Sequence, residues 1–252
     1  MIDLHDPPAL LRYDGFTASE LAELCQAPRV VLYDTIGSVL DVAHQLAEQG
    51  TPAGTIVLAE EQTAGRGRQG RVWHSPAGAG IWMAVVLRPP EPFVPGAFAL
   101  RAGNFVLLAV TGARAIEARL KWPNDIVVKR RKLAGVLCEA RWKGSQLQWV
   151  SVGVGINVRG PLPEPLRELA TTMEEQGADT NRPAIVMAIS RLFRTLGRRA
   201  GPLGEAERAR LAQEVERALP TGFAEIEPDG TLVVRGNRGP GAAVLDRRVM
   251  PL

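Results

Sequence analysis

A short, uninterrupted apolar run at residues 81–87, Ile-Trp-Met-Ala-Val-Val-Leu, places the strongest limit on how this chain can fold. A run that is both continuous and this brief favours a β-strand buried on both faces. The Pro-rich stretch 89–95 ends it. With 252 residues, 46% of them hydrophobic, the chain can bury one sizeable core plus a small appendage. The run therefore predicts a strand inside that core.

Other segments carry the signals of further helices and strands. A capping box, Thr17-Ala-Ser-Glu20, begins one short helix, and apolar residues at 39, 42, 43 and 46 with Gly50 after them mark an amphipathic helix. Longer helices are predicted at about 97–118, 182–199 and 204–218, and strands at 30–33, 54–61, 120–122, 126–129, 133–140 and 147–158, with a turn at Arg130-Arg131. This order predicts the α+β class, with a mixed, mainly antiparallel sheet and helices mainly on one face.

The C-terminal residues carry a separate set of strand signals. Strand-like pieces lie at 224–227, 231–234 and 243–245, with a hairpin signal at Asp229-Gly230. We therefore predict three parts, which are a short N-terminal helical extension (1–28), a main domain (29–220) and a small C-terminal β domain (221–252).

Composition and charge narrow the functional classes. A net charge of +3 is small beside 30 basic and 27 acidic residues, so a general nucleic-acid partner is not implied. The basic residues concentrate at 65–71 and 129–132, which suits a phosphate ligand. Cys25 and Cys138 lie far apart and complete no zinc set with the three histidines, so a reducing cytoplasm is expected. No signal-peptide pattern and no apolar run of about 18 residues is present, which predicts no membrane span.

The loop at residues 65–71, Gly-Arg-Gly-Arg-Gln-Gly-Arg, with Trp73 just beyond it, is the strongest functional signal. Its glycines let backbone amides approach a ligand, while Arg66, Arg68 and Arg71 offer planar forks for oxyanions. No Gly-Lys-Ser/Thr follows, which excludes the Walker loop, and no helix opens after Trp73, which excludes the dinucleotide fingerprint. The loop predicts an anion cradle, and a solvated basic loop is the alternative.

Lysine is scarce, and its placement points to the same chemistry. The chain has only Lys121, Lys129, Lys132 and Lys143, and three of them fall within residues 121–132. Since arginine is used almost everywhere else, at least one of these positions is expected to need a compact ammonium. Chance and codon bias are the alternative explanation.

Four motifs, in this order, resemble the signature set of biotin protein ligases. They are the arginine loop with Trp73, Lys-Trp-Pro-Asn-Asp at 121–125, Lys-Leu-Ala-Gly at 132–135 and Gly-Val-Gly-Ile-Asn at 153–157. The resemblance implies a biotin/lipoate ligase core of the class II synthetase type as the main, catalytic domain, a truncated SH3-like C-terminal β appendage, and a homodimer. About thirty residues precede this core, fewer than the winged helix of some members needs, so no DNA-binding repressor function is expected.

The reaction implied by the resemblance has two steps. The biotin carboxylate attacks the α-phosphorus of ATP to give biotinyl-5'-AMP and pyrophosphate, and a lysine of a biotin carboxyl carrier protein of acetyl-CoA carboxylase then displaces AMP. No enzyme nucleophile is needed, so positioning and charge neutralisation dominate. Lys132, Arg66 and Arg68 would be catalytic, and Mg²⁺ would neutralise the departing pyrophosphate.

The resemblance also implies the ligand contacts. Biotin would contact Ser38, Val39, Leu40, Gln62, Arg66, Gly67, Arg68, Lys132, Gly135, Gly153 and Gly155, and ATP would contact Arg66, Arg68, Arg71, Trp73, Asn124, Lys132 and Asn157. No residue is assigned to a metal. Core packing is the alternative for Trp73, Trp82 and Trp122. For Asp125, a metal contact and the capping or orienting of a neighbour are equally open.

One segment departs from the resemblance. The family usually shows Ser-Thr-Asn where this chain has Ser38-Val39-Leu40, so two polar groups toward the biotin ureido ring are missing. Their loss would weaken or loosen biotin binding unless Gly37 or the backbone supplies the contacts. The alternative functions are a ligase for lipoate or another acyl acid, and a non-catalytic module that binds biotin or nucleic acid.

Overall fold

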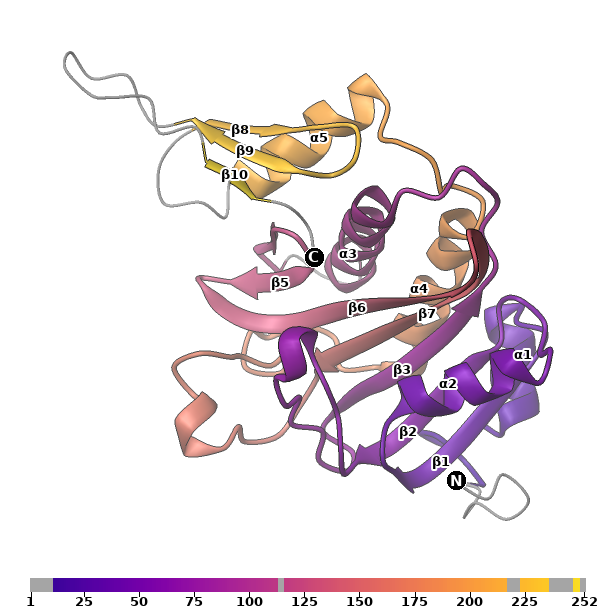
Figure 1. Ribbon diagram of the computed structural model, residues 1–252. Helices are drawn as coiled ribbons and strands as arrows, with labels where there is room; N and C mark the ends of the chain where they lie inside the picture. Colours follow the sequence, from indigo (N-terminus) through magenta and orange to yellow (C-terminus); the bar gives the residue numbers. More distant parts are fainter. Residues whose placement is uncertain (1–10, 113–115, 217–222, 236–246, 250–252) are drawn as a thin grey trace.

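One mixed sheet organises the computed structural model, which describes residues 11–112, 116–216, 223–235 and 247–249. Its strands are β1 (Val30–Ile36), β2 (Ile56–Gln62), β3 (Gly80–Leu87), β4 (Ala118–Lys121), β5 (Asp125–Val128), β6 (Arg131–Lys143) and β7 (Gln146–Asn157). They lie in the order β1-β2-β3-β7-β6-β5-β4 (Figure 1). Only β1 and β2 are parallel neighbours, and every other pair within this sheet is antiparallel, as predicted.

Helices cover both faces of the sheet unequally. The helices are α1 (Ala18–Cys25), α2 (Val39–Glu48), α3 (Pro95–Thr111), α4 (Arg182–Leu196) and α5 (Glu205–Glu216). Buried residues of α1, α3, α4 and α5 share one core cluster with the sheet, while α2 packs alone on the opposite face (Figure 1). The prediction of helices mainly on one face is confirmed. None of the helices in the described ranges is long and apolar enough to cross a membrane.

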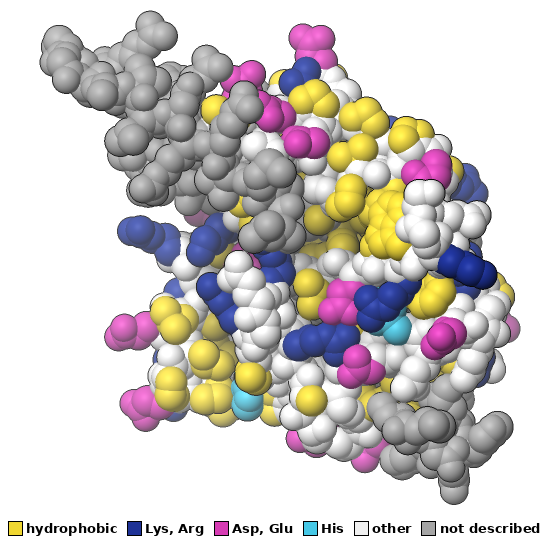
Figure 2. Space-filling view, in the orientation of Figure 1, with side chains coloured by type: hydrophobic (Ala, Val, Ile, Leu, Met, Phe, Trp, Pro, Cys, Tyr) yellow, Lys and Arg dark blue, Asp and Glu magenta, His cyan; other side chains and the backbone are white. Residues whose placement is uncertain are grey.

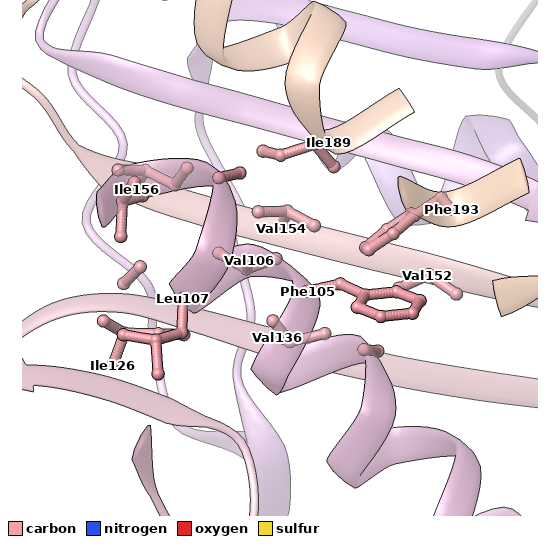
Figure 3. Close-up of a cluster of buried hydrophobic side chains, with 14 of the residues drawn as sticks. Phe105, Val106, Leu107, Ile126, Val136, Val152, Val154, Ile156, Ile189 and Phe193 are labelled. Atoms are coloured by element: carbon pink, nitrogen blue, oxygen red, sulfur yellow. The ribbon is translucent and has the colours of Figure 1, made fainter. Parts of the chain in front are cut away.

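Strand β3 explains why an unbroken apolar run was the leading fold signal. Side chains of a strand alternate between its two faces, and here both faces are covered. The cluster with α3 and α4 takes Ile81, Met83, Val85 and Leu87, and the cluster with α2 takes Ala84 and Val86. All residues of β3 are buried. Figure 3 shows side chains of α3 and α4 lying over those of β6 and β7 in the first cluster.

The helix predicted at 97–118 is shorter in the structure. Helix α3 ends at Thr111, and Ala118 is already the first residue of β4. Gly112 follows the helix directly, and glycine is a common helix stop. The helix-forming residues that come after Gly112 in the sequence hid this end, so the prediction of one continuous helix was wrong.

The turn predicted at Arg130-Arg131 lies one residue earlier. Lys129 and Arg130 have φ values of 46° and 73°, which makes them the turn residues of the β5–β6 hairpin. Arg131 is therefore the first residue of β6. The other predicted elements of the main sheet agree with the structure to within a few residues, although β1 and β6 extend further than expected.

A smaller antiparallel sheet follows α5 in the order β10-β9-β8 (Figure 1). Its strands are β8 (Phe223–Ile226), β9 (Leu232–Arg235) and β10 (Arg247–Val249). The predicted hairpin turn is confirmed, with Gly230 at φ +92°, whereas the strand predicted at 243–245 lies outside the described residues. The division into parts at 28 and 220 stays a prediction.

A buried arginine joins three distant segments near the N-terminal end of α4. Arg182 is 3% exposed and pairs with both Asp14 and Glu60, with its Nη1 2.7 Å from Glu60 Oε2. Its guanidinium carbon also lies 4.3 Å from the centre of the Tyr13 ring. Removal of one partner from such a buried network leaves uncompensated charge in the interior. Arg182 therefore ties the segment before α1 and strand β2 to α4.

We expect Arg182→Ala to lower the free energy of unfolding by about 3–5 kcal/mol, because Asp14 and Glu60 would lose their buried partner. Urea denaturation measures the loss. Arg12→Ala is the matched control, since the Arg12–Glu20 pair has side chains that are 60% and 54% exposed and its loss should cost no more than about 1 kcal/mol. A similar small loss for Arg182→Ala would contradict the structural role of this network.

Candidate active site

A cavity of about 690 Å³ lies between the arginine loop, the N-terminus of α2 and strands β6 and β7. All residues that the sequence predicts as ligand contacts line it, namely Ser38, Val39, Leu40, Gln62, Arg66, Gly67, Arg68, Arg71, Trp73, Asn124, Lys132, Gly135, Gly153, Gly155 and Asn157. The structure thus brings residues as far apart in the sequence as Ser38 and Asn157 into one site. In Figure 2, Lys and Arg side chains gather across the middle of the molecule beside carboxylates.

Glycines of β6 and β7 form the floor of the cavity. Gly135 and Gly155 are direct partners in the β6–β7 ladder, and Gly153 lies opposite Leu137 on the same strands. A Cβ at Gly155 would lie 2.4 Å from Cε2 of Trp73, and one at Gly153 would lie 2.9 Å from the Leu40 side chain. Both positions therefore require glycine, because Trp73 and Leu40 occupy the space that a side chain would need.

The three tryptophans of the motifs have different environments. Trp82 is 1% exposed and its Nε1 donates to Glu60 O, while Trp122 Nε1 donates to Gly230 O. Core packing thus accounts for Trp82, and Trp122 supports the C-terminal hairpin. Trp73 Nε1 is buried and has no hydrogen-bond partner within the described residues. A buried donor without a partner is uncommon in proteins, so this indole favours a ligand acceptor.

The backbone of Lys132 is fixed from two sides. Its N–H donates to Leu169 O at 2.8 Å, and its carbonyl accepts from Thr171 N at 2.9 Å. Asn157 Nδ2 donates to the same Lys132 carbonyl at 3.3 Å and to Thr171 O at 3.2 Å. The amide nitrogen of Asn157 therefore positions Lys132, which leaves its oxygen for the ligand contact that the sequence predicts.

The ammonium of Lys132 is held inside the cavity by two groups. Its Nζ lies 2.7 Å from Asp125 Oδ1 and 4.9 Å from the centre of the Trp73 ring. The second distance is within the range of a cation–π contact. Asp125 thus orients its neighbour, which was the alternative to a metal contact at this position.

The arginine loop is a narrow hairpin at the cavity wall. Arg66 and Val72 form a β-bridge, and Gly67 N–H donates to Arg71 O at 2.7 Å. The tip, Arg68–Gly70, is a short 3-10 turn. This geometry places consecutive arginines of the loop in different surroundings.

Positive charge dominates the cavity wall. Among the described residues, the lining carries six Lys or Arg side chains but two carboxylates, Asp125 and Glu168; the six are Arg66, Arg68, Arg71, Lys121, Arg130 and Lys132. The whole chain is nearly balanced, so this excess is local. Arg68 Nη1 donates to the neutral Asn124 Oδ1 at 3.2 Å. The cavity is therefore suited to an anionic ligand.

Arg66 faces carboxylates instead. Its Nε and Nη2 donate to the two oxygens of Glu139 at 3.1 Å each, and its Nη1 lies 2.8 Å from Asp41 Oδ1. His44 Nε2 lies 2.8 Å from Glu139 Oε2. The bond from His44 and the bonds from Arg66 lower the pKa of Glu139 to about 2, against the opposite effect of partial burial. Glu139 is thus an ionised carboxylate at neutral pH.

The N-terminus of α2 forms the apolar end of the cavity. Ser38 Oγ accepts from Leu40 N at 3.3 Å as the helix cap, and Gln62 Oε1 accepts from Val39 N at 3.0 Å. The backbone amides of 39 and 40 are therefore already paired and do not replace the missing polar side chains. Val39 and Leu40 are each 3% exposed.

Sequence reasoning missed two parts of the site. The segment 162–170 contributes Leu162, Leu166 and Leu169 to the cavity wall, and no motif marks it. Glu139 and His44 were also missed, because they lie 95 residues apart and meet only through the packing of α2 on the sheet. The Pro-rich composition of 161–165 is the one local signal that this segment is not a regular element.

Comparisons with known proteins show what this fold and cavity resemble. Residues 36–157, just under half of the chain, match the biotin/lipoate A/B protein ligase family. The match spans β1 to β7 in part or whole and includes all four sequence motifs. Within the family, the resemblance to biotin protein ligases is confirmed by the relatives that the chain matches.

Two curated relatives and one solved structure illustrate this. The chain is 37% identical over 169 residues to a bifunctional ligase/repressor BirA of Bacillus spizizenii, covering 65% of this chain and 52% of that protein. It is 37% identical to a biotin--[acetyl-CoA-carboxylase] ligase of Mycobacterium tuberculosis, covering 66% of this chain and 61% of that protein. The chain thus spans about half or somewhat more of the length of these relatives.

The structural likeness extends over more of the chain. A biotin protein ligase of Aquifex aeolicus in complex with biotin and ATP superimposes with a TM-score of 0.71, covering 89% of this chain and 96% of that one at 24% identity. At this identity the likeness shows a common fold, and the predicted fold class is confirmed.

We expect the free energy of unfolding to fall more steeply in acid for the wild type than for Glu139→Gln. A carboxylate with a folded pKa of about 2 and an unfolded pKa of about 4.3 contributes stability that is complete above pH 4.3 and is lost as pH falls toward 2. The two slopes should differ by about 1 kcal/mol per pH unit between pH 4 and 3. Urea titrations at several pH values measure them, with Glu23→Gln as the matched control. Parallel curves for wild type and Glu139→Gln would contradict the pairing.

Proposed function

We propose that this chain is an ATP-dependent biotin protein ligase. It would activate biotin as biotinyl-5'-AMP and transfer it to a lysine of a biotin carboxyl carrier protein of acetyl-CoA carboxylase. The observation that carries the proposal is one cavity that joins an apolar end at α2 to a cationic wall containing Lys132 and Arg68. Such a shape suits an acid with a long apolar part whose carboxylate must meet a phosphate.

In the first step, a biotin carboxylate oxygen forms a bond to the α-phosphorus of ATP, and the bond from that phosphorus to the pyrophosphate oxygen breaks. Negative charge accumulates at the acyl phosphate. Lys132 Nζ, oriented by Asp125, and the Arg68 guanidinium would stabilise this charge. Trp73 would present its ring and its unpartnered indole N–H to the nucleotide.

In the second step, the amine of the acceptor lysine attacks the acyl carbon, an amide forms, and AMP leaves with the phosphate oxygen. The amine loses its proton to solvent. Neither step needs a covalent enzyme intermediate. The two cysteines fit this reading, because burial raises the pKa of Cys25 to about 11 and that of Cys138 to about 12, which keeps both as thiols.

Magnesium would enter with the nucleotide. Within the described ranges no group of three or more His, Cys, Asp or Glu side chains could hold a metal ion. Asp125, one of the carboxylates of the cavity wall, is already paired with Lys132. We therefore propose that ATP phosphates hold Mg²⁺, whose charge would offset that of the pyrophosphate.

The proposed setting follows from the same reaction. We place it in the cytoplasm, which agrees with two free cysteines, and we propose no DNA partner, which agrees with the small net charge. A homodimer is proposed on the resemblance alone. The proposed ligase domain is 29–220, with 1–28 and 221–252 as its N-terminal and C-terminal additions.

One observation supports a second candidate, a ligase for lipoate or another acyl acid. The end of the cavity at α2 is formed by Val39 and Leu40, and the adjacent backbone amides are paired with Gln62 and Ser38. A pocket end without free polar groups discriminates weakly between a ureido ring and an apolar ring.

Exchange of labelled pyrophosphate into ATP tests both candidates. It reports the first half-reaction without the carrier protein. We expect exchange with biotin, because the cationic wall and the motifs are intact. Exchange with lipoate but not biotin would move the function to the second candidate, and no exchange with either acid would leave a binding role.

We expect Lys132→Ala to lower the exchange rate about 10²- to 10³-fold, because a fixed charge that meets the developing anion would be lost. Steady-state exchange at saturating ATP measures this. Lys143→Ala is the matched control, since that lysine is exposed at the far end of β6 and should leave the rate unchanged. A near-normal rate for Lys132→Ala would remove it from the mechanism.

A further inference from the structure

The two leading arginines of the loop are held by different kinds of partner. Arg66 contacts two carboxylates, through its Nε, Nη1 and Nη2, from Glu139 and Asp41. Arg68 contacts the neutral amide of Asn124. The charge of Arg66 is therefore compensated before any ligand binds, whereas Arg68 has no carboxylate partner in the described part of the chain. An approaching phosphate would meet net negative charge around Arg66, which disfavours direct contact.

Glu139 is itself oriented by a buried histidine. Trp149 Nε1 can only donate, and it lies 2.9 Å from His44 Nδ1. Nδ1 is therefore the acceptor, so neutral His44 carries its proton on Nε2, which donates to Glu139 Oε2 at 2.8 Å. Ser151 Oγ lies 3.3 Å from the same Nδ1. The chain of bonds runs from β7 through α2 and β6 to the arginine loop, and each donor faces an acceptor.

Arg66 lies at the base of the loop hairpin, so this chain of hydrogen bonds holds the loop in place. Arg66 pairs with Val72 in a β-bridge at the base of the hairpin. Arg68 lies at the tip, and Trp73 N–H donates to Gly65 O at 2.8 Å on the other side of the base. Holding the Arg66 side chain therefore fixes the backbone between Arg68 and Trp73, the two loop residues that would face the nucleotide.

We infer that Glu139, oriented by His44, and Arg66 are positioning residues that anchor the arginine loop, and that Arg68 is the loop arginine that binds the ligand anion. The inference assigns Arg66 a role other than the anion contact implied by the sequence. Its activity readout rests on the proposed function, while its structural readout does not.

Hydrogen exchange of the ligand-free protein tests the anchor directly. The amides of Gly67 and Trp73 are the bonded reporters of the hairpin base. In Glu139→Gln and in Arg66→Met, the peptide that contains the Gly67 and Trp73 amides should exchange its hydrogens about 10-fold faster or more. The reason is that the loop opens locally when its anchor is lost. Arg68→Met is the matched control and should leave this exchange unchanged. Unchanged exchange in both Glu139→Gln and Arg66→Met would overturn the inference.

A double-mutant cycle separates anchoring from direct contact in the exchange of pyrophosphate into ATP. If Glu139 and Arg66 act as one unit, Glu139→Gln and Arg66→Met each lower kcat/KM, and the double variant is no worse than Arg66→Met alone. If Arg66 bound the anion itself, Glu139→Gln would free it from a competing carboxylate and lower the KM for ATP. A lowered KM in Glu139→Gln would therefore refute the anchoring role.

The two proposals fail in different ways. Absence of exchange activity in the wild type with any acid would defeat the proposed ligase function, yet the hydrogen-exchange comparison would still decide the anchor. Thermal unfolding shows that each variant is folded. If Glu139→Gln does not fold, Arg66→Lys examines the same pair from the loop side, since lysine keeps the charge but loses the two-bond contact with Glu139. Wild-type protection of the loop amides in Arg66→Lys would then count against the inference.

Discussion

The pairing of β6 with β7 through Gly135 and Gly155 is the contact on which the site depends. Glycine within a strand weakens a sheet because it offers no side chain to pack. Here the β6–β7 hairpin is long, with pairing from Ala134 opposite Ile156 to Lys143 opposite Gln146. Its many other backbone pairs offset the weak glycine positions. The bare floor leaves room above the sheet for Trp73. The missing Cβ atoms thus let Trp73 and Leu40 pack directly against the sheet at the cavity.

The charges around that floor are arranged before any ligand arrives. Lys132 is fixed by backbone bonds to the 169–171 segment, and its ammonium is oriented by Asp125. A charge that needs no rearrangement at the moment of reaction stabilises a developing anion more effectively than a mobile one. Asp125 and Glu139 therefore act by holding cationic side chains in place. Glu139 holds Arg66, and its low pKa keeps it charged at neutral pH.

Much of the fold could be predicted from the sequence, because its signals lie within short segments of the chain. The apolar run at 81–87 and the alternating strands after it report burial directly, and the motif residues converge because each lies at a strand end or in a loop beside one. The sequence alone does not show which distant side chains contact one another in the fold. Arg66 and Arg68 are the same residue type two positions apart. The packing of α2 and β6 gives Arg66 two carboxylate partners, whereas Arg68 has none among the residues that the structure describes. The same limit hid His44 and the 162–170 segment.

Helix α2 connects the two ends of the cavity. Its first turn carries Leu40, whose side chain fills the space beside Gly153 at the apolar end. The next positions along the helix carry Asp41 and His44, both of which belong to the network around Arg66. Residues one helical turn apart lie on one face, so a shift of α2 that makes room near Leu40 also moves the partners of Arg66. Helix α2 thus carries both a residue of the apolar end of the cavity and two residues of the network that holds the arginine loop.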